Sequence, residues 1–207
     1  MKIIHYFLDT ETGGLDAYKN PLLEIYILKR INGKKTDEFY AKILPHPKDI
    51  IDPVALDKNG LRPYSWDIDD SDVYTARDAA IAMDRFFEIP RKGEGVSYVV
   101  AHNAKFDVGY IRALSKKTGV RIGMPYLQID TVHLAAAYLV PLGLQNHRMD
   151  TIREFLGMSA EKAHTAQKDV EDMVRLYDLL TPPIHPNRWR ALMTFIARIS
   201  FVSQSLL

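Results

Sequence analysis

The chain has 207 residues, 47% of them hydrophobic and 26% charged, and it contains no cysteine. This composition is typical of a globular protein that folds without crosslinks, and it excludes disulfide frameworks, thiolate zinc sites and cysteine nucleophiles. The net charge of +1 argues against a protein that coats long duplexes through a whole-molecule basic field. No stretch approaches the roughly 20 apolar residues of a membrane span, so we expect no membrane insertion and a cytoplasmic location.

The first part of the chain is predicted to form strands. Residues 3–8 are an almost unbroken apolar run, which is typical of a strand buried on both faces. Residues 22–31 and 39–44 resemble two more strands, and an Asn-Gly pair at 32–33 predicts the turn between them. We therefore expect an antiparallel meander. Residues 45–70 are rich in proline and aspartate and are interpreted as mainly loop.

From residue 76 onward, predicted helices alternate with a strand. The strand covers residues 96–101, and the helices cover residues 76–87, 105–118, a segment from about 131, 150–156 and 165–180. This order predicts an α/β fold in which a mixed central β-sheet is flanked by helices.

Prolines at residues 182–186 mark a break in the chain. We predict one domain over residues 1–181 and a C-terminal helical extension over residues 182–207, whose apolar residues recur at helical spacing. The extension is expected to pack on its own domain. The alternatives are a contact through residues 187–207 with a polymerase or with a second copy in a homodimer.

Two acidic residues directly follow the first apolar run. Because side chains alternate along a strand, Phe7, Asp9 and Glu11 lie on one face. Two carboxylates are therefore predicted to project side by side from the carboxyl end of a buried strand. The competing interpretation is a strand end before a turn, since a Gly-Gly pair follows at 13–14.

Two further acidic residues each begin an apolar helical stripe. Asp107 is followed at helical spacing by Ile111 and Leu114, and Asp169 is followed in the same way by Met173. An acid in the first turn of a helix is usually a capping or dipole group, and each of these two taken alone has that interpretation. Together with the paired acids on the strand, they predict a site at which four carboxylates meet.

Converging carboxylates repel one another and are costly to bury, so they either take up protons or bind cations. Oxygen ligands without cysteine favour hard ions, Mg²⁺ or Mn²⁺. A pair of such ions about 3.5–4 Å apart is a known arrangement for in-line phosphoryl displacement.

Three motifs in this order resemble the DnaQ-like exonucleases of the ribonuclease H-like superfamily. The motifs are DTETGGL at residues 9–15, HNAKFD at residues 102–107 and HTAQKD at residues 164–169. They resemble the branch named for its Asp-Glu-Asp-Asp acids plus histidine. The resemblance covers most of the chain and implies a ribonuclease H-like fold with 3′–5′ exonuclease activity.

The resemblance also implies roles for the motif residues. Asp9, Glu11, Asp107 and Asp169 would hold two divalent ions, which would bind the scissile phosphate and lower the pKa of a water molecule. His164 would be the general base, a role suited to a side chain that titrates near neutrality. The competing interpretation of His164 is a surface histidine. Products would be nucleoside 5′-monophosphates.

Residues next to the acids are expected to contact the terminal nucleotide; these candidates are Thr12, Gly13, Leu15, His102, Asn103 and Phe106. Glycine in the first turn allows backbone N–H groups to approach the substrate closely, and Leu15 would wedge against the last base. Phe106 either stacks on a base or packs in the core. His102 and Asn103 either bind the terminal sugar or phosphate or stabilise the turn.

One segment departs from the family pattern, and the natural substrate stays open. Many members have His-Gly-Ile where this chain has Asn59-Gly60-Leu61. The family's substrate contacts in this loop therefore do not carry over to this chain by resemblance. The leading hypothesis is an exonuclease that acts on a single-stranded or frayed 3′ end of DNA, as in proofreading or repair. The alternatives are an exoribonuclease on the same scaffold and a non-catalytic nucleic-acid-binding module.

Overall fold

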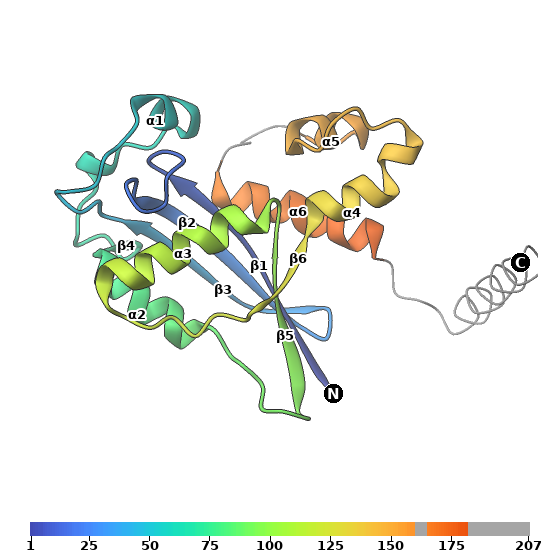
Figure 1. Ribbon diagram of the computed structural model, residues 1–207, viewed down its shortest axis with the longest axis horizontal. Helices are drawn as coiled ribbons and strands as arrows, with labels where there is room; N and C mark the ends of the chain where they lie inside the picture. Colours follow the sequence, from blue (N-terminus) through green and yellow to red (C-terminus); the bar gives the residue numbers. More distant parts are fainter. Residues whose placement is uncertain (160–164, 182–207) are drawn as a thin grey trace, which may run out of the picture.

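A computed structural model describes residues 1–159 and 165–181 (Figure 1). Within these residues, six strands form one sheet in the order β4-β3-β2-β1-β5-β6. The strands are β1 Lys2–Thr12, β2 Leu22–Ile31, β3 Lys34–Ile43, β4 Val73–Tyr74, β5 Gly95–Ala101 and β6 Leu127–Asp130. β1 pairs antiparallel with β2 and parallel with β5, so the sheet is mixed, as predicted. β2 and β3 are also antiparallel, which confirms the predicted meander.

Helices cover both faces of this sheet (Figure 1). They are α1 Pro53–Asn59, α2 Ala76–Phe86, α3 Ala104–Thr118, α4 Thr131–Tyr138, α5 Met149–Phe155 and α6 Ala166–Leu180, with short 3₁₀ turns at Pro63–Ser65 and Val140–Leu142. Tyr6 packs against Phe86 of α2, whereas the next residue of β1, Phe7, packs against Tyr177 of α6. Because consecutive strand residues face opposite sides, α2 and α6 cover opposite faces. The predicted α/β class is confirmed.

The central strand is buried on both faces, as its apolar run predicts. Ile4, Tyr6, Phe7 and Leu8 have no exposed surface. β1 also extends beyond the predicted residue 8 and ends at Thr12. The acidic residues of the first motif therefore belong to the strand itself, where backbone pairing with β2 holds them in register.

Residues 45–70 are mainly loop, as predicted, but they also contain α1, which was not predicted. Asp52 caps this helix through a bond from the Val54 amide, and Pro53 occupies its first turn. The helix ends at Asn59 and is capped by Gly60, whose φ of 70° suits glycine. α1 buries none of its residues, so the segment has no apolar stripe from which sequence periodicity could predict it.

The described residues leave several sequence predictions untested. The extension over residues 182–207, with its proposed polymerase or homodimer contact, lies outside them, and the division at residue 181 stays a prediction. Within residues 1–159 and 165–181, no helix is both long enough and apolar enough to span a bilayer.

Replacing a side chain in the middle of β1 should weaken the whole fold. Leu8 has no exposed surface, so Leu8→Ala removes packed apolar atoms and should lower the free energy of unfolding by about 2–5 kcal/mol. Urea denaturation measures this value. The matched control is Leu15→Ala, because Leu15 is 88% exposed and its loss should change stability by less than about 0.5 kcal/mol. Equal losses for the two variants would contradict the assigned core.

Candidate active site

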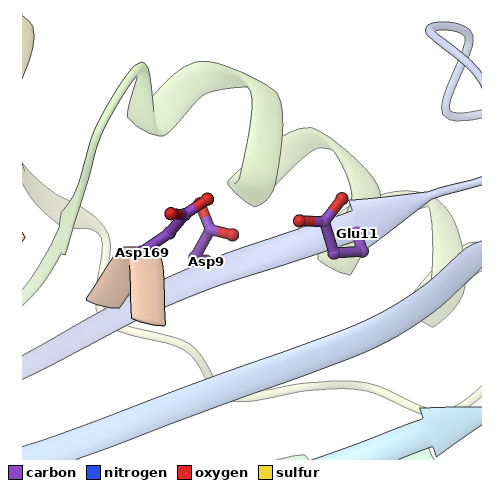
Figure 2. Close-up of side chains that lie close together, drawn as sticks. All are labelled: Asp9, Glu11 and Asp169. Carbon is purple, nitrogen blue, oxygen red and sulfur yellow. The ribbon is translucent and has the colours of Figure 1, made fainter. Parts of the chain in front are cut away.

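Three of the four predicted acids lie together. Carboxylate oxygens of Asp9, Glu11 and Asp169 are all within 4.8 Å of one another. Figure 2 shows Asp9 and Glu11 on the same side of β1, with Asp169 beside Asp9 at the start of α6. Thr165 caps α6 by accepting a bond from the Lys168 amide, which places Asp169 in the first turn of the helix. Strand alternation and helix capping thus bring together acids from distant parts of the sequence.

Asp107, the fourth acid, approaches the strand from the other side. It lies in the first turn of α3, is 2% exposed and accepts a 2.7 Å hydrogen bond from the Thr10 hydroxyl. Because side chains alternate along β1, Thr10 points away from the face that carries Asp9 and Glu11. Asp107 lines the same cavity as the other acids but, among the described residues, is not a member of the group within 4.8 Å.

Burial and the negative charges nearby make Asp9 and Asp107 hard to ionise. Burial raises the pKa of Asp9 well above its ordinary value, and the negative charges of Asp107 and Asp169 raise it further. Burial, opposed by the hydrogen bond from Thr10, raises the pKa of Asp107 to about 7. Each group favours its neutral form unless positive charge is supplied nearby.

Glu11 shows the same effect at the outer end of the cluster. Burial raises its pKa to about 8, with further contributions from the negative charges of Asp169 and Glu24. Lys58 and a hydrogen bond with Asn59 act in the opposite direction. The donor set consists of carboxylate oxygens that repel one another, which fits hard divalent cations.

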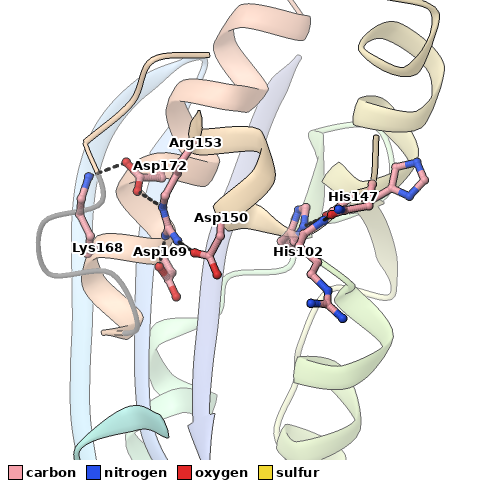
Figure 3. Close-up of polar contacts among 9 residues, drawn as sticks. His102, His147, Asp150, Arg153, Lys168, Asp169 and Asp172 are labelled. Atoms are coloured by element: carbon pink, nitrogen blue, oxygen red, sulfur yellow. Dashed lines mark hydrogen bonds and ion pairs between the residues drawn. The ribbon is translucent and has the colours of Figure 1, made fainter. Parts of the chain in front are cut away.

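A buried arginine, which the sequence analysis did not single out, touches this cluster. Arg153 of α5 is 2% exposed, and its guanidinium contacts Asp150, Asp169 and Asp172 (Figure 3). Asp172, on α6, has no exposed surface. An arginine in a short helix gives no sequence signal of burial, because most arginines are solvated. Its partner Asp172 lies on the buried face of α6. An acid on that face is the sequence feature that could have indicated a buried cationic partner.

α1 also reaches the site, and sequence reasoning missed its contribution. The Asn59 side-chain amide donates a 3.2 Å hydrogen bond to the Thr12 carbonyl. Lys58 lines the cavity of about 440 Å³ that contains the acids and also the adjoining cavity of about 860 Å³. The segment in which this chain departs from the family pattern therefore adjoins the carboxylates.

The first motif's turn is held rigidly beside the acids. The hydroxyl groups of Thr12 and Tyr110 both donate to the Gly14 carbonyl, at 2.7 and 2.8 Å. A side chain at Gly13 would lie 2.8 Å from Pro21, so the turn requires glycine there. Leu15 is 88% exposed and lines the smaller cavity. This position is compatible with the predicted contact to a terminal base, which stays a prediction.

The second motif begins with a histidine that is bound within the protein. The His102 Nδ1 lies 2.9 Å from the Thr131 hydroxyl, and its Nε2 lies 2.7 Å from the His147 carbonyl (Figure 3). Burial lowers the pKa of His102, which favours the neutral ring. The ring also borders both cavities. Its contacts match the turn-stabilising alternative, and a contact with nucleic acid stays a prediction.

Asn103 and Phe106 complete the second motif. Asn103 has a φ of 70° at the start of α3, and its amide donates to Asp130, which accepts the Ala104 amide as well. Asp130 thus binds the amides at the N-terminus of the helix that carries Asp107. Phe106 is half-buried, packs against Tyr110 and borders the smaller cavity. This position permits the predicted base contact.

His164, the predicted general base, lies outside the described residues. The described part of the third motif begins at Thr165, and α6 begins at Ala166. The role of His164 therefore stays a prediction.

The raised pKa values predict that the ion-free protein loses stability as pH rises. Glu11 binds its proton more tightly in the folded chain than in the unfolded chain, so its stabilising contribution is full below about pH 4.5 and is lost as pH rises through about 8. We expect Glu11→Gln to be more stable than the parent at pH 8 in EDTA, by more than about 1 kcal/mol, and to show a flatter pH profile.

Urea denaturation at pH 5 and pH 8, with EDTA or with Mg²⁺, measures this effect. Mg²⁺ should stabilise the parent at pH 8 more than it stabilises Glu11→Gln. Identical pH profiles for parent and variant in EDTA would contradict the raised pKa of Glu11.

Comparisons with known proteins agree with this fold. The family model RNase_T, described as Exonuclease, matches residues 6–177. A DNA polymerase III of the PolC type from Listeria monocytogenes is 30% identical over 164 residues, covering 79% of this chain and 10% of that protein. A ribonuclease T from Shewanella frigidimarina is 27% identical over 199 residues, covering 89% of this chain and 83% of that protein.

Solved structures of E. coli exonuclease I have the same fold. The zinc-bound complex with single-stranded DNA matches with a TM-score of 0.71 and 17% identity, over 92% of this chain and 43% of that chain. The complex with a dT13 oligonucleotide has a TM-score of 0.71 and 16% identity over the same shares. The chain thus spans about a tenth of the polymerase and less than half of exonuclease I. The matched family model and the ribonuclease H-like fold show that the chain belongs to the DnaQ-like 3′–5′ exonuclease family.

Proposed function

We propose that the chain hydrolyses phosphodiester bonds at 3′ ends of nucleic acid and releases nucleoside 5′-monophosphates. The observation that carries this proposal is the group of carboxylates from Asp9, Glu11 and Asp169 within 4.8 Å of one another, in a chain that matches the exonuclease family model. The raised pKa values of Asp9 and Glu11, in a cavity that Asp169 also lines, are typical of a functional site.

In this proposal Asp9, Glu11, Asp107 and Asp169 bind two Mg²⁺ or Mn²⁺ ions. When bound, the ions neutralise charge on the scissile phosphate and make the attacking water more acidic. Asp9 and Glu11 are presented on a paired strand, so their carboxylates keep their orientation without the substrate. Asp107 is held by Thr10 on the other side of β1 and closes the site from that direction.

The remaining steps belong to protein side chains. His164 removes the proton from the attacking water, since histidine can exchange a proton near neutral pH. Leu15 and Phe106 border the cavity and contact the terminal base, while the backbone of the 12–14 turn approaches the sugar and phosphate. Lys58, on the rim of the same cavity, attracts the phosphate backbone.

DNA is the substrate that we propose first. A relative of this chain is a DNA polymerase, and the structures similar to this chain include an exonuclease bound to single-stranded DNA. RNA is the second candidate, because the chain matches 83% of the length of a ribonuclease T. In either case the partner is a single-stranded or frayed 3′ end. We also propose a cytoplasmic location, and residues 187–207 as a contact with a polymerase or a second copy.

The test is digestion of a 5′-labelled DNA strand and of the matching RNA, with Mg²⁺ or Mn²⁺. We expect a ladder that shortens from the 3′ end and nucleoside 5′-monophosphate as product. Asp9→Asn and Asp169→Asn should each lower the rate by at least about a thousandfold without unfolding the protein. The matched control is Glu171→Gln, which changes an exposed acid on the same helix as Asp169 and should keep the parental rate.

A parent that binds the strand in Ca²⁺ but fails to cleave in Mg²⁺ or Mn²⁺ would support the non-catalytic binding module instead. Near-parental rates in Asp169→Asn would contradict the site assignment. Faster digestion of RNA than of DNA would favour the second candidate substrate.

His164→Ala should reduce catalysis and leave binding intact. Loss of a general base lowers kcat by about a hundredfold to ten-thousandfold, whereas the dissociation constant for a labelled strand in Ca²⁺ should change by less than about twofold. Single-turnover cleavage and fluorescence anisotropy measure the two quantities. A defect confined to binding would contradict the role of His164 as base.

A further inference from the structure

A buried guanidinium connects the acidic cluster to α5. Arg153 Nε donates to Asp172 Oδ2 at 2.8 Å, and Nη1 donates to Asp150 Oδ1 at 2.8 Å. Nη2 donates to Oδ1 of Asp169, a member of the carboxylate cluster (Figure 3). The three acids occupy three different nitrogens of one planar group, so the orientation of the guanidinium is tightly constrained.

Asp172 is the anchor of this arrangement. It lies one helical turn after Asp169 on α6 and has no exposed surface. Its second oxygen, Oδ1, accepts a 2.6 Å hydrogen bond from Lys168. A buried ion pair of this kind keeps one geometry, because moving either partner would leave an unpaired charge in the protein interior. Arg153 is therefore a rigid support and not a mobile surface cation.

We propose that Arg153 is a positioning residue that holds the Asp169 carboxylate in the orientation required to bind a divalent cation. This inference rests on the proposed function of the site. A carboxylate has two oxygens, so Asp169 can accept the guanidinium through Oδ1 and present Oδ2 to an ion. Side chains that orient a metal ligand in this way are known to change metal affinity by about 10- to 100-fold.

Orientation, and not net charge, is the effect expected to dominate. Arg153 and Lys168 contribute two positive charges, which face the negative charges of Asp150 and Asp172. These opposite charges partly offset one another, which reduces the net positive field that the guanidinium produces at Asp169. Removing Arg153 should therefore weaken cation binding, because the Asp169 carboxylate is held less firmly. Removal also ends the repulsion between the guanidinium and the cation, but the resulting gain in cation affinity should be small.

The experiment separates positioning from a purely structural role. Arg153→Met alone leaves Asp172 buried without its main partner and is expected to destabilise the fold. The double variant Arg153→Met/Asp172→Leu removes one positive and one negative charge together, which restores the charge balance of the interior. Replacing a buried ion pair by apolar side chains is often neutral for stability. Arg153→Lys keeps the charge but loses the planar, three-way geometry.

Mn²⁺ binding to each protein without nucleic acid is measured by electron paramagnetic resonance and calorimetry, and unfolding is followed in EDTA. In the double variant and in Arg153→Lys, we expect the Mn²⁺ dissociation constant to rise about tenfold or more. The Mg²⁺ concentration for half-maximal cleavage should rise in parallel. A folded double variant, or a folded Arg153→Lys, that binds Mn²⁺ within twofold of the parent would overturn the proposal.

The matched control is Arg30→Met/Asp178→Leu. This ion pair, with a 2.7 Å contact, ties β2 to the opposite end of the same helix α6. Its removal should leave Mn²⁺ binding unchanged, and a tenfold loss there would show that any loosening of α6 is sufficient and would overturn the specific role of Arg153. If the parent bound Mn²⁺ but cleaved no strand, the proposed function would fail while the binding series would still decide the role of Arg153.

Discussion

Mutual repulsion among carboxylates in a partly buried cavity is the constraint on which the rest of this structure depends. β1 carries an apolar segment through the middle of the sheet and then presents Asp9 and Glu11 near its carboxyl end. Asp169 joins them from a helix that lies far away in sequence. Burial raises the pKa values of Asp9 and Glu11, and the negative charge of Asp169 raises them further. Such a cluster persists because a rigid scaffold, stabilised by burial elsewhere, holds each acid in place.

The scaffold holds the acids through contacts that are themselves polar. Asp130 binds the first amides of α3 and so positions the helix that carries Asp107. Thr165 caps α6 just before Asp169, and Arg153 contacts the Asp169 carboxylate directly. The caps satisfy amides at the helix ends, which have no partner within the helix, and the Arg153 contact satisfies a buried guanidinium. The same bonds that stabilise the helix ends therefore also set the geometry of the site.

Local periodicity explains which predictions are confirmed. The apolar run of β1 and the stripes of α3 and α6 depend on geometry within one segment, and their members Phe7, Ile111 and Met173 are all buried. β4 and β6 were not predicted, because β4 is two residues long and exists only through pairing with β3. β6 is four residues long and pairs with β5. Strands this short contain too few residues to show the alternation of apolar and polar side chains from which a strand is predicted.

The sequence by itself determined the α/β class, the face of each acidic residue and the motif order that indicates the exonuclease family, because each depends on residue type and spacing. Tertiary structure alone decided which acids meet. It placed Asp107 on the other side of β1 from Asp9 and brought α1 to the cavity. It also turned Arg153, an unremarkable residue in the sequence, into a buried partner of Asp169. The physical reason is that contacts between separate elements depend on how their surfaces pack, which the spacing within one segment does not contain.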